Sequence, residues 1–128
     1  GVHNFTATTG NTFKIALYDS DATLGASTTA FSTSEEITNT SGTAYTSGGA
    51  TLTSVTPVAS STTAICDFSD VSYSSASFTA NGALIYNSSA SNVAVCAIAF
   101  GSDKTATNGT FTIQFPTADA TNAIIRLA

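Results

Sequence analysis

Short runs of alternating apolar and polar residues, separated by clusters of Gly, Asn, Asp and Ser, most constrain how this chain folds. Successive side chains of a β-strand point to opposite sides, so such a run buries one face of a strand. Thr12–Tyr18 is the clearest example, with Phe13, Ile15 and Leu17 on one face. Thr110–Phe115 repeats the pattern. The sequence therefore predicts β-structure, and no segment has the periodicity of a long helix.

Other runs share this enrichment in β-branched, aromatic and small apolar residues. They are Ala50–Val58, Thr62–Phe68, Val71–Thr79, Leu84–Tyr86, Asn92–Phe100 and Ala123–Leu127. Asn81-Gly82 is a pair typical of two-residue hairpin turns, so it predicts a hairpin between the runs on either side of it, an ordinary loop being the alternative. Ser60-Ser61 predicts a second hairpin turn. The run from Asn92 is apolar on both faces, which is typical of a central strand covered on each side.

About eight strands spaced at roughly 8 to 12 residues favour one antiparallel β-sandwich or jelly-roll-like domain over residues 1–128. Two segments have no strand pattern. Gly1–Asn11 is expected to form an extended N-terminal arm. Ala22–Thr46 is expected to be an ordered but irregular excursion, exposed enough to contact a neighbour. Within it, Ser34–Ile37 fits either one helical turn or a short edge strand.

Charged residues are scarce, at 9% of the chain, whereas Ser and Thr together supply roughly a third. The net charge of −5 rests on eight carboxylates against Lys14, Lys104 and Arg126, which are too few cations to neutralise a run of phosphates. Nucleic-acid binding is therefore excluded. The longest apolar run, Val93–Gly101, is far shorter than the roughly 18 to 20 residues that cross a bilayer, so no membrane association is expected.

The residues needed for catalysis do not form a recognisable pattern. A nucleophilic triad needs a base, and the single imidazole, His3, lies in the N-terminal segment. The carboxylate pairs are Asp19 with Asp21, Glu35 with Glu36, and Asp67 with Asp70. Each flanks a predicted strand end, where Asp is a turn former, and none reproduces a calcium-binding loop. The sequence predicts a protein that is not an enzyme, with no catalytic residue, cofactor or metal ligand.

Cysteine and tyrosine each allow two interpretations. Cys66 and Cys96 lie within apolar runs, where cysteine is usually a small buried hydrophobic residue; a disulfide is the alternative. The four tyrosines are either half-buried in the sheets or form a sugar-stacking face. They are Tyr18, Tyr45, Tyr73 and Tyr86.

Three stretches spread over nearly the whole chain form a specific combination of residues. They are Phe13–Tyr18 with Ala22–Gly25, Gly48–Leu52, and Gly101–Thr105 leading through Gly109–Pro116 to Asn122–Arg126. In this order and spacing they resemble a family of short proteins encoded among the virion structural genes of tailed bacteriophages. The resemblance implies a component of the phage particle, assembled in the bacterial cytoplasm, and above all a capsid decoration or cement protein. A tail or fibre module that binds host-surface glycans is the alternative.

A cement protein must bury area across its neighbours, so the two unpatterned segments are the expected contact regions. The expected partners are the major capsid protein and other copies of this chain. Phe5 and Phe31 would be the apolar anchors, with Glu35, Glu36 and Ile37 beside them. With so few charges, binding should depend weakly on salt.

Overall fold

A computed structural model describes residues 1–127, and this part of the chain is all-β, with seven strands and no helix. The strands are β1 (Phe13–Tyr18), β2 (Ala50–Leu52), β3 (Val58–Ser60), β4 (Thr63–Cys66), β5 (Val71–Asn87), β6 (Val93–Ile113) and β7 (Ile125–Leu127). No membrane-spanning helix is therefore found among the described residues. The predicted all-β, sandwich-like class is confirmed, with seven strands in place of about eight.

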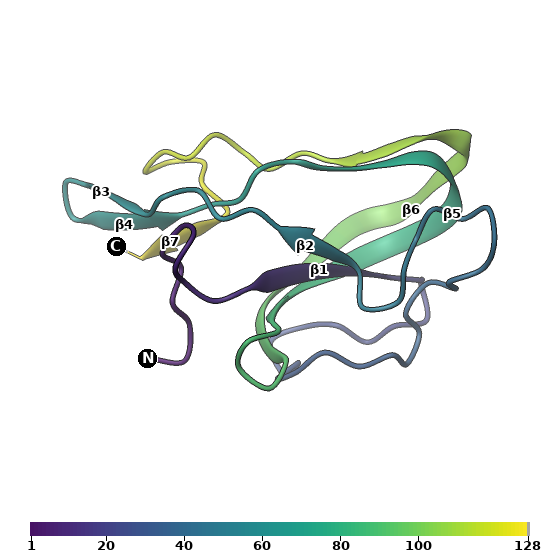
Figure 1. The fold of residues 1–128 in the computed structure, drawn as a ribbon, viewed down its shortest axis with the longest axis horizontal. Coiled ribbons are helices and arrows are strands. Elements are labelled where there is room, and N and C mark those ends of the chain that lie inside the picture. The colour runs from purple at the N-terminus through teal and green to yellow at the C-terminus, as the bar shows by residue number, and fades with distance from the viewer. Residues whose placement is uncertain (128) are drawn as a thin grey trace.

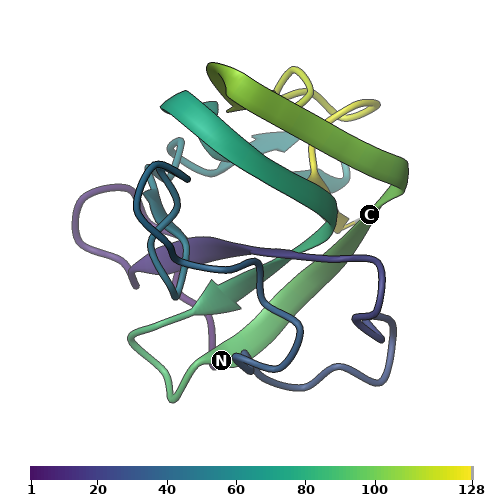
Figure 2. The same cartoon turned by 90° about the vertical axis from the view of Figure 1, so that its right-hand side faces the viewer.

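The strands form two antiparallel sheets, one with the order β2-β1-β5-β6 and a smaller one with the order β3-β4-β7 (Figure 1). Strands β5 and β6 make a long hairpin that pairs from Asn87↔Val93 to Val71↔Ile113. The turn-proximal part of this hairpin, residues 82–87 and 93–99, lies beside β1. Figure 2 shows β5 and β6 curling away from β1. As a result, the turn-distal part of the hairpin, residues 71–80 and 104–113, lies over the turn-proximal part.

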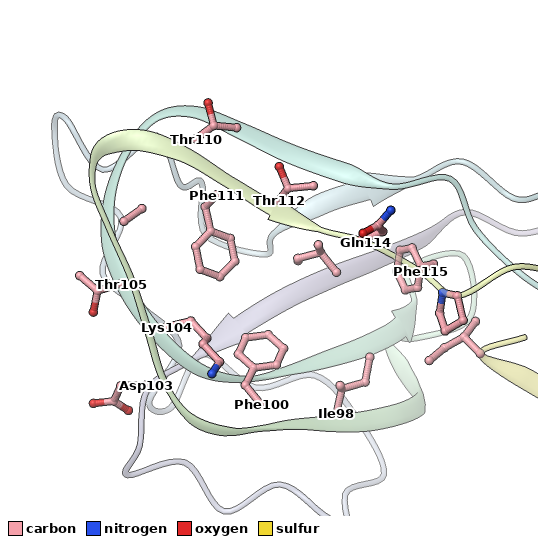
Figure 3. A pocket seen from close by; sticks show the side chains of 14 residues that line it. Ile98, Phe100, Asp103, Lys104, Thr105, Thr110, Phe111, Thr112, Gln114 and Phe115 are labelled. Atoms are coloured by element: carbon pink, nitrogen blue, oxygen red, sulfur yellow. The ribbon is translucent and has the colours of Figure 1, made fainter. Parts of the chain in front are cut away.

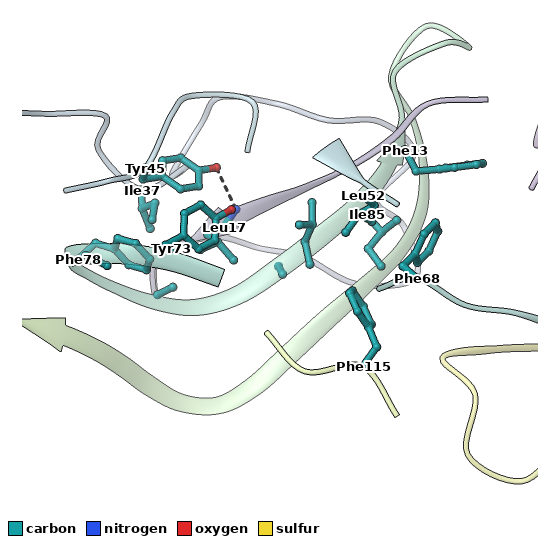
Figure 4. Close-up of a cluster of buried hydrophobic side chains, with 14 residues drawn as sticks. Phe13, Leu17, Ile37, Tyr45, Leu52, Phe68, Tyr73, Phe78, Ile85 and Phe115 are labelled. Carbon is teal, nitrogen blue, oxygen red and sulfur yellow. Dashed lines mark hydrogen bonds between the residues drawn. The ribbon is translucent and has the colours of Figure 1, made fainter. Parts of the chain in front are cut away.

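Because the hairpin bends back on itself, it encloses the main core between its two parts. Phe13, Ile15 and Leu17 of β1 are fully buried there, as the alternation predicts, opposite Tyr73 and Phe78 of the turn-distal part (Figure 4). Fully burying one such side chain contributes about 1.5 to 3 kcal/mol. The core is therefore built mainly by β1 and by the two ends of β5.

The other face of the sheet is covered by the irregular excursion, which crosses it as expected without helix or extended strand. Leu24 and Phe31 pack there against Tyr18 and Tyr86, and the ring centroids of Phe31 and Tyr86 are 4.6 Å apart. All four tyrosines are at most 9% exposed, which confirms the buried interpretation over a sugar-stacking face.

The Asn81-Gly82 hairpin prediction is wrong. Both residues lie inside β5, where Gly82 pairs with Tyr18 on one side and with Ala99 on the other. A register shift between Ala80 and Gly82 marks a β-bulge at this point, so the pair bends a continuous strand instead of ending it. The turn lies at residues 88–92, which joins β5 to β6.

The prediction of a central strand over Asn92–Phe100 is also wrong in its lateral position. This stretch begins β6, which lies at the edge of the sheet, whereas β1 and β5 are central. Its two faces are covered only in part: Cys96 packs against the main core and Ala94 against the residues beneath the excursion, but Ala97 and Ala99 are exposed. Residues 101–108, which separate this run from the predicted run Thr110–Phe115, are instead part of the continuous strand β6.

The other strand predictions are confirmed with changed bounds. β3 and β4 form the hairpin expected at Ser60-Ser61, and β7 closes the chain. The expected run from Ala50 to Val58 is divided between β2 and β3 in different sheets. Cys66 and Cys96 are free, partly buried thiols, and burial raises the pKa of each.

The extended N-terminal arm is not observed. Residues 4–11 turn back on themselves, and the Asn11 amide donates to the Asn4 carbonyl at 2.8 Å. The Phe5 ring stacks on Phe13 with centroids 4.6 Å apart. Asn87, which is completely buried, contacts this segment: its Nδ2 lies 3.1 Å from His3 Nδ1.

Candidate functional site

The bend of β6 leaves an apolar cleft of about 710 Å³ on the open side of the long hairpin. Ile98 in the turn-proximal part and Phe100 just after it form one wall, and Phe111 and Ile113 from the turn-distal part form the other. Figure 3 shows Phe100 and Phe111 pointing into the space that the curved strand surrounds. Phe115, which is 8% exposed, lies at one end. The cleft is thus a part of the main core that β6 does not close.

Local backbone features of β6 and β5 produce this opening. Gly101 and Asn108 have positive φ angles of 77° and 54°, which interrupt the regular extended backbone between the two walls. The pairing with β5 shifts register between Ala76 and Phe78 and again before Gly82. Bulges increase the twist and bend of a strand, so a 21-residue strand folds over instead of running straight.

The rim of the cleft is polar but nearly uncharged. It carries Thr105, Thr110, Thr112 and Gln114, which are exposed. Thr110 and Thr112 point away from the cleft in Figure 3, and the Thr112 hydroxyl lies 3.0 Å from the Ser72 hydroxyl of β5. Such a rim around an apolar floor is the usual arrangement of a protein contact surface.

Two charged side chains lie at the mouth and point in different directions. Lys104 is directed toward the cleft in Figure 3, and its Nζ donates to Ser102 Oγ at 2.9 Å. Asp103 points away from the cleft, and its carboxylate accepts a hydrogen bond from Asn81 Nδ2 at 2.8 Å. The local charge that the cleft presents is therefore positive, although the whole chain is negative.

An unpaired strand edge borders the same opening. Among the strands of residues 1–127, β6 pairs with β5 alone. The excursion bonds to the start of its outer edge, where the Ala94 amide donates to the Thr29 carbonyl at 2.9 Å and Ala30 bridges Val93, but no strand lies beside the rest of that edge. An unpaired edge presents backbone N–H and C=O groups to any extended chain that can approach. The cleft and the edge of β6 together are named the β6 surface below.

Two of the residues expected to contact a partner instead pack within the chain. Phe5 belongs to the edge of the main core, and Phe31 stacks on Tyr86 beneath the excursion. Both are partly buried. Their role as partner anchors stays a prediction, but in this structure each ring already has an aromatic neighbour.

Glu36 and Ile37 complete the edge of β1, since β2 covers it only from Phe13 to Ile15. The Ile37 amide donates to the Leu17 carbonyl at 3.0 Å, and Ile37 is only 6% exposed. The Leu17 amide donates to the Tyr45 hydroxyl at 3.1 Å (Figure 4). The Tyr45 hydroxyl in turn donates to the Glu36 carboxylate at 2.6 Å. Burial, and then the bond to Glu36, raise the pKa of Tyr45.

Tyr73 lies beside this network, and within residues 1–127 its hydroxyl is the buried side-chain polar group without a hydrogen-bond partner. Its hydroxyl faces the Ala50 amide but does not reach hydrogen-bond geometry. Burial is the main reason that the pKa of Tyr73 is raised to about 12. The Glu36 and Tyr73 region is therefore a structural part of the core rim.

Glu35 is exposed and lies near two other carboxylates. Oxygen atoms of Asp19, Asp21 and Glu35 lie within 4.8 Å of one another, the one such group among the described residues. The Asp19 carboxylate accepts a bond from the Asp21 amide at 3.0 Å, as an Asp in a turn does. Oxygen ligands of this kind suit Ca²⁺, but three carboxylates alone fall short of the six to eight ligands that it takes.

The other carboxylates hold the backbone. Asp67 accepts from the Phe68 amide and Asp70 from the Phe115 amide, each at 2.8 Å. Asp70 thereby ties the start of β5 to the residues just after β6. These interactions fit the predicted turn and scaffold role.

Comparison of the chain with protein-family models, with curated proteins and with solved structures finds no match.

The β6 surface was only partly visible in the sequence. The alternation predicted that Phe111, Ile113 and Phe115 face inward, and all three line the cleft. Phe111 and Ile113 remain partly exposed because nothing in the described chain covers them on the open side. The signal that could have indicated this is the group of turn-forming residues at 101 and 108–109 inside a strand that otherwise alternates.

Proposed function

We propose that this protein is a structural component of a tailed-phage virion, namely a capsid decoration protein that stabilises the head shell. Its place would be the assembled particle, formed in the cytoplasm of the bacterial host. The resemblance of three stretches of sequence to phage virion proteins supports this proposal, as does a surface rich in Ser and Thr and poor in charge. Lys and Glu are depleted where protein surfaces become interfaces.

The single observation that carries the proposal is the β6 surface. An apolar cleft of about 710 Å³ with a polar rim, next to an unpaired strand edge, is suited to contact with another protein chain. A standard interface buries about 800 Å² per partner, a modest part of the 6842 Å² that the domain exposes. The major capsid protein and sister copies of this chain are the partners that a decoration protein would contact.

The glycan-binding fibre module is the competing function. Such sites commonly stack sugar rings on exposed aromatic faces, and the tyrosines expected to do so are buried. We therefore place the decoration role first.

The copy number in purified virions tests the proposal. A decoration protein should be present at a ratio to the major capsid protein within a small factor of one, as measured by quantitative mass spectrometry of particles. A few copies per particle would instead favour a tail or fibre component. Complete absence from particles that are washed at low and high salt would exclude both.

A further inference from the structure

The open side of the long hairpin has the features of a strand-docking site. Peptides that add to a sheet edge gain backbone hydrogen bonds from the edge, and their alternate side chains enter pockets beside it. Here the edge of β6 supplies the backbone groups, and the cleft lined by Phe100, Phe111 and Ile113 supplies the pocket for side chains. Phe111 and Ile113 lie two residues apart, which is the spacing of one face of a strand.

The positive charge of Lys104 at the mouth of the cleft indicates which kind of segment could bind there. Lys104 is one of three cations in a chain with eight carboxylates, and it points into the cleft with a neutral hydroxyl as its acceptor. The adjacent carboxylate, Asp103, is turned outward and is held by Asn81. The mouth therefore attracts a negative group that approaches from outside.

We propose that the β6 surface binds an extended segment of a partner protein, one that alternates apolar side chains and carries a carboxylate opposite Lys104. The apolar side chains fill the cleft, the backbone adds to the edge of β6, and the carboxylate fixes the register. This assignment deepens the proposed function, because it names the partner segment by which the protein would attach to the shell.

Another role for Lys104 makes a different prediction. Charged side chains on an edge strand, especially Lys, often serve to prevent edges from pairing with other copies. In that case Lys104 would repel strands instead of selecting one, and its removal would cause the chain to self-associate.

The test uses the full chain and two fluorescent synthetic peptides of alternating valine and threonine, one with a central aspartate and the other with a central lysine. Binding is measured by fluorescence polarisation, for the unaltered protein, for Lys104→Glu and for the control Arg126→Glu. Arg126 is an exposed cation on β7 that does not line the cleft. The control therefore makes the same charge change outside the site.

The unaltered chain and the control should bind the aspartate peptide about tenfold more tightly than the lysine peptide. Lys104→Glu should reverse this preference, because a like charge then faces the aspartate. Equal binding of both peptides, or no binding of either, would overturn the proposal. So would a Lys104→Ala variant, which removes the charge, if it forms dimers or larger species in analytical ultracentrifugation. The copy number in virions is a separate measurement, so the proposed function and this site can fail independently.

Discussion

At the scale of single residues, the junction before β2 depends on a glycine. Gly49 has a φ of +75°, and a Cβ placed on it would overlap the carbonyl of Ile15 on the neighbouring strand. Because glycine has no Cβ, it can adopt a left-handed conformation and also allow two backbones to approach closely. This position sets how β2 joins the edge of β1.

A glycine series separates these two requirements. Gly49→Ala should lower the free energy of unfolding by about 3 kcal/mol or more, because strain and overlap combine. Gly42→Ala, with a φ of +84° and no atom within 4 Å of the added Cβ, should cost about 1 kcal/mol from strain alone. Gly25→Ala, which meets neither problem, should lie within about 0.5 kcal/mol of the unaltered chain.

Urea denaturation followed by circular dichroism measures all three variants. Equal stability of the Gly49 and Gly25 variants would mean that the junction before β2 relaxes freely, and that the contact with Ile15 does not fix it.

At the scale of elements, the N-terminal segment acts as a part of the domain. Phe5 covers Phe13, and Asn87 Nδ2 contacts the Val2 carbonyl at 3.2 Å and Asn11 Oδ1 at 3.0 Å. A buried amide that loses its partners costs about 1 to 3 kcal/mol. The segment therefore stabilises the end of β1 and β5 that it covers.

Deleting residues 1–9 should lower the free energy of unfolding by about 2 to 4 kcal/mol, since aromatic packing and partners of Asn87 are lost together. Val2→Ala is the control: this side chain is 58% exposed, so its loss should change stability by less than about 0.5 kcal/mol. Thermal unfolding monitored by calorimetry gives the comparison. An unchanged melting temperature after the deletion would mean that the segment is a free arm after all.

How far the sequence predicted these elements depends on the range of the interactions involved. The strand at Thr12–Tyr18 was predicted with its buried face, because side-chain alternation is a local property. The hairpin predicted at Asn81-Gly82 was wrong because the local preference of this pair for a turn is overridden by strand pairing. Gly82 pairs with Tyr18 on one side and with Ala99 on the other. Such pairing joins residues far apart in the chain and leaves no local signal.

The candidate site shows the same limit. The inward direction of Phe111 and Ile113 follows from alternation, but the cleft needs Phe100 on the opposite wall. Phe100 comes to lie opposite Phe111 because β6 bends. The bend arises from several small backbone deviations, including the one at Gly101. Each deviation resembles a loop signal in the sequence, and only the paired structure shows that the strand continues.

At the scale of the whole molecule, the scarcity of charge determines how the protein would hold a capsid. With three cations and eight carboxylates in 128 residues, an interface built on the β6 surface contains few ion pairs and much apolar contact. Salt screens exposed charges over a Debye length that falls from about 10 Å at 0.1 M to about 3 Å at 1 M, but it does not weaken apolar contact. Attachment should therefore survive salt.

Raising NaCl from about 50 mM to about 500 mM should weaken binding to empty capsids by no more than about threefold. This is the contribution to affinity expected of one exposed ion pair between Lys104 and a carboxylate of the partner. Ammonium sulfate at the same ionic strength should strengthen it, because excluded salts favour apolar burial. Cosedimentation with purified shells measures occupancy in both series. With Lys104→Glu the NaCl dependence should reverse, because salt then screens a repulsion between two carboxylates in place of an attraction. A loss of more than tenfold in NaCl would show that the shell is held by charges, and the β6 surface, with its single inward cation, would then not be the main contact.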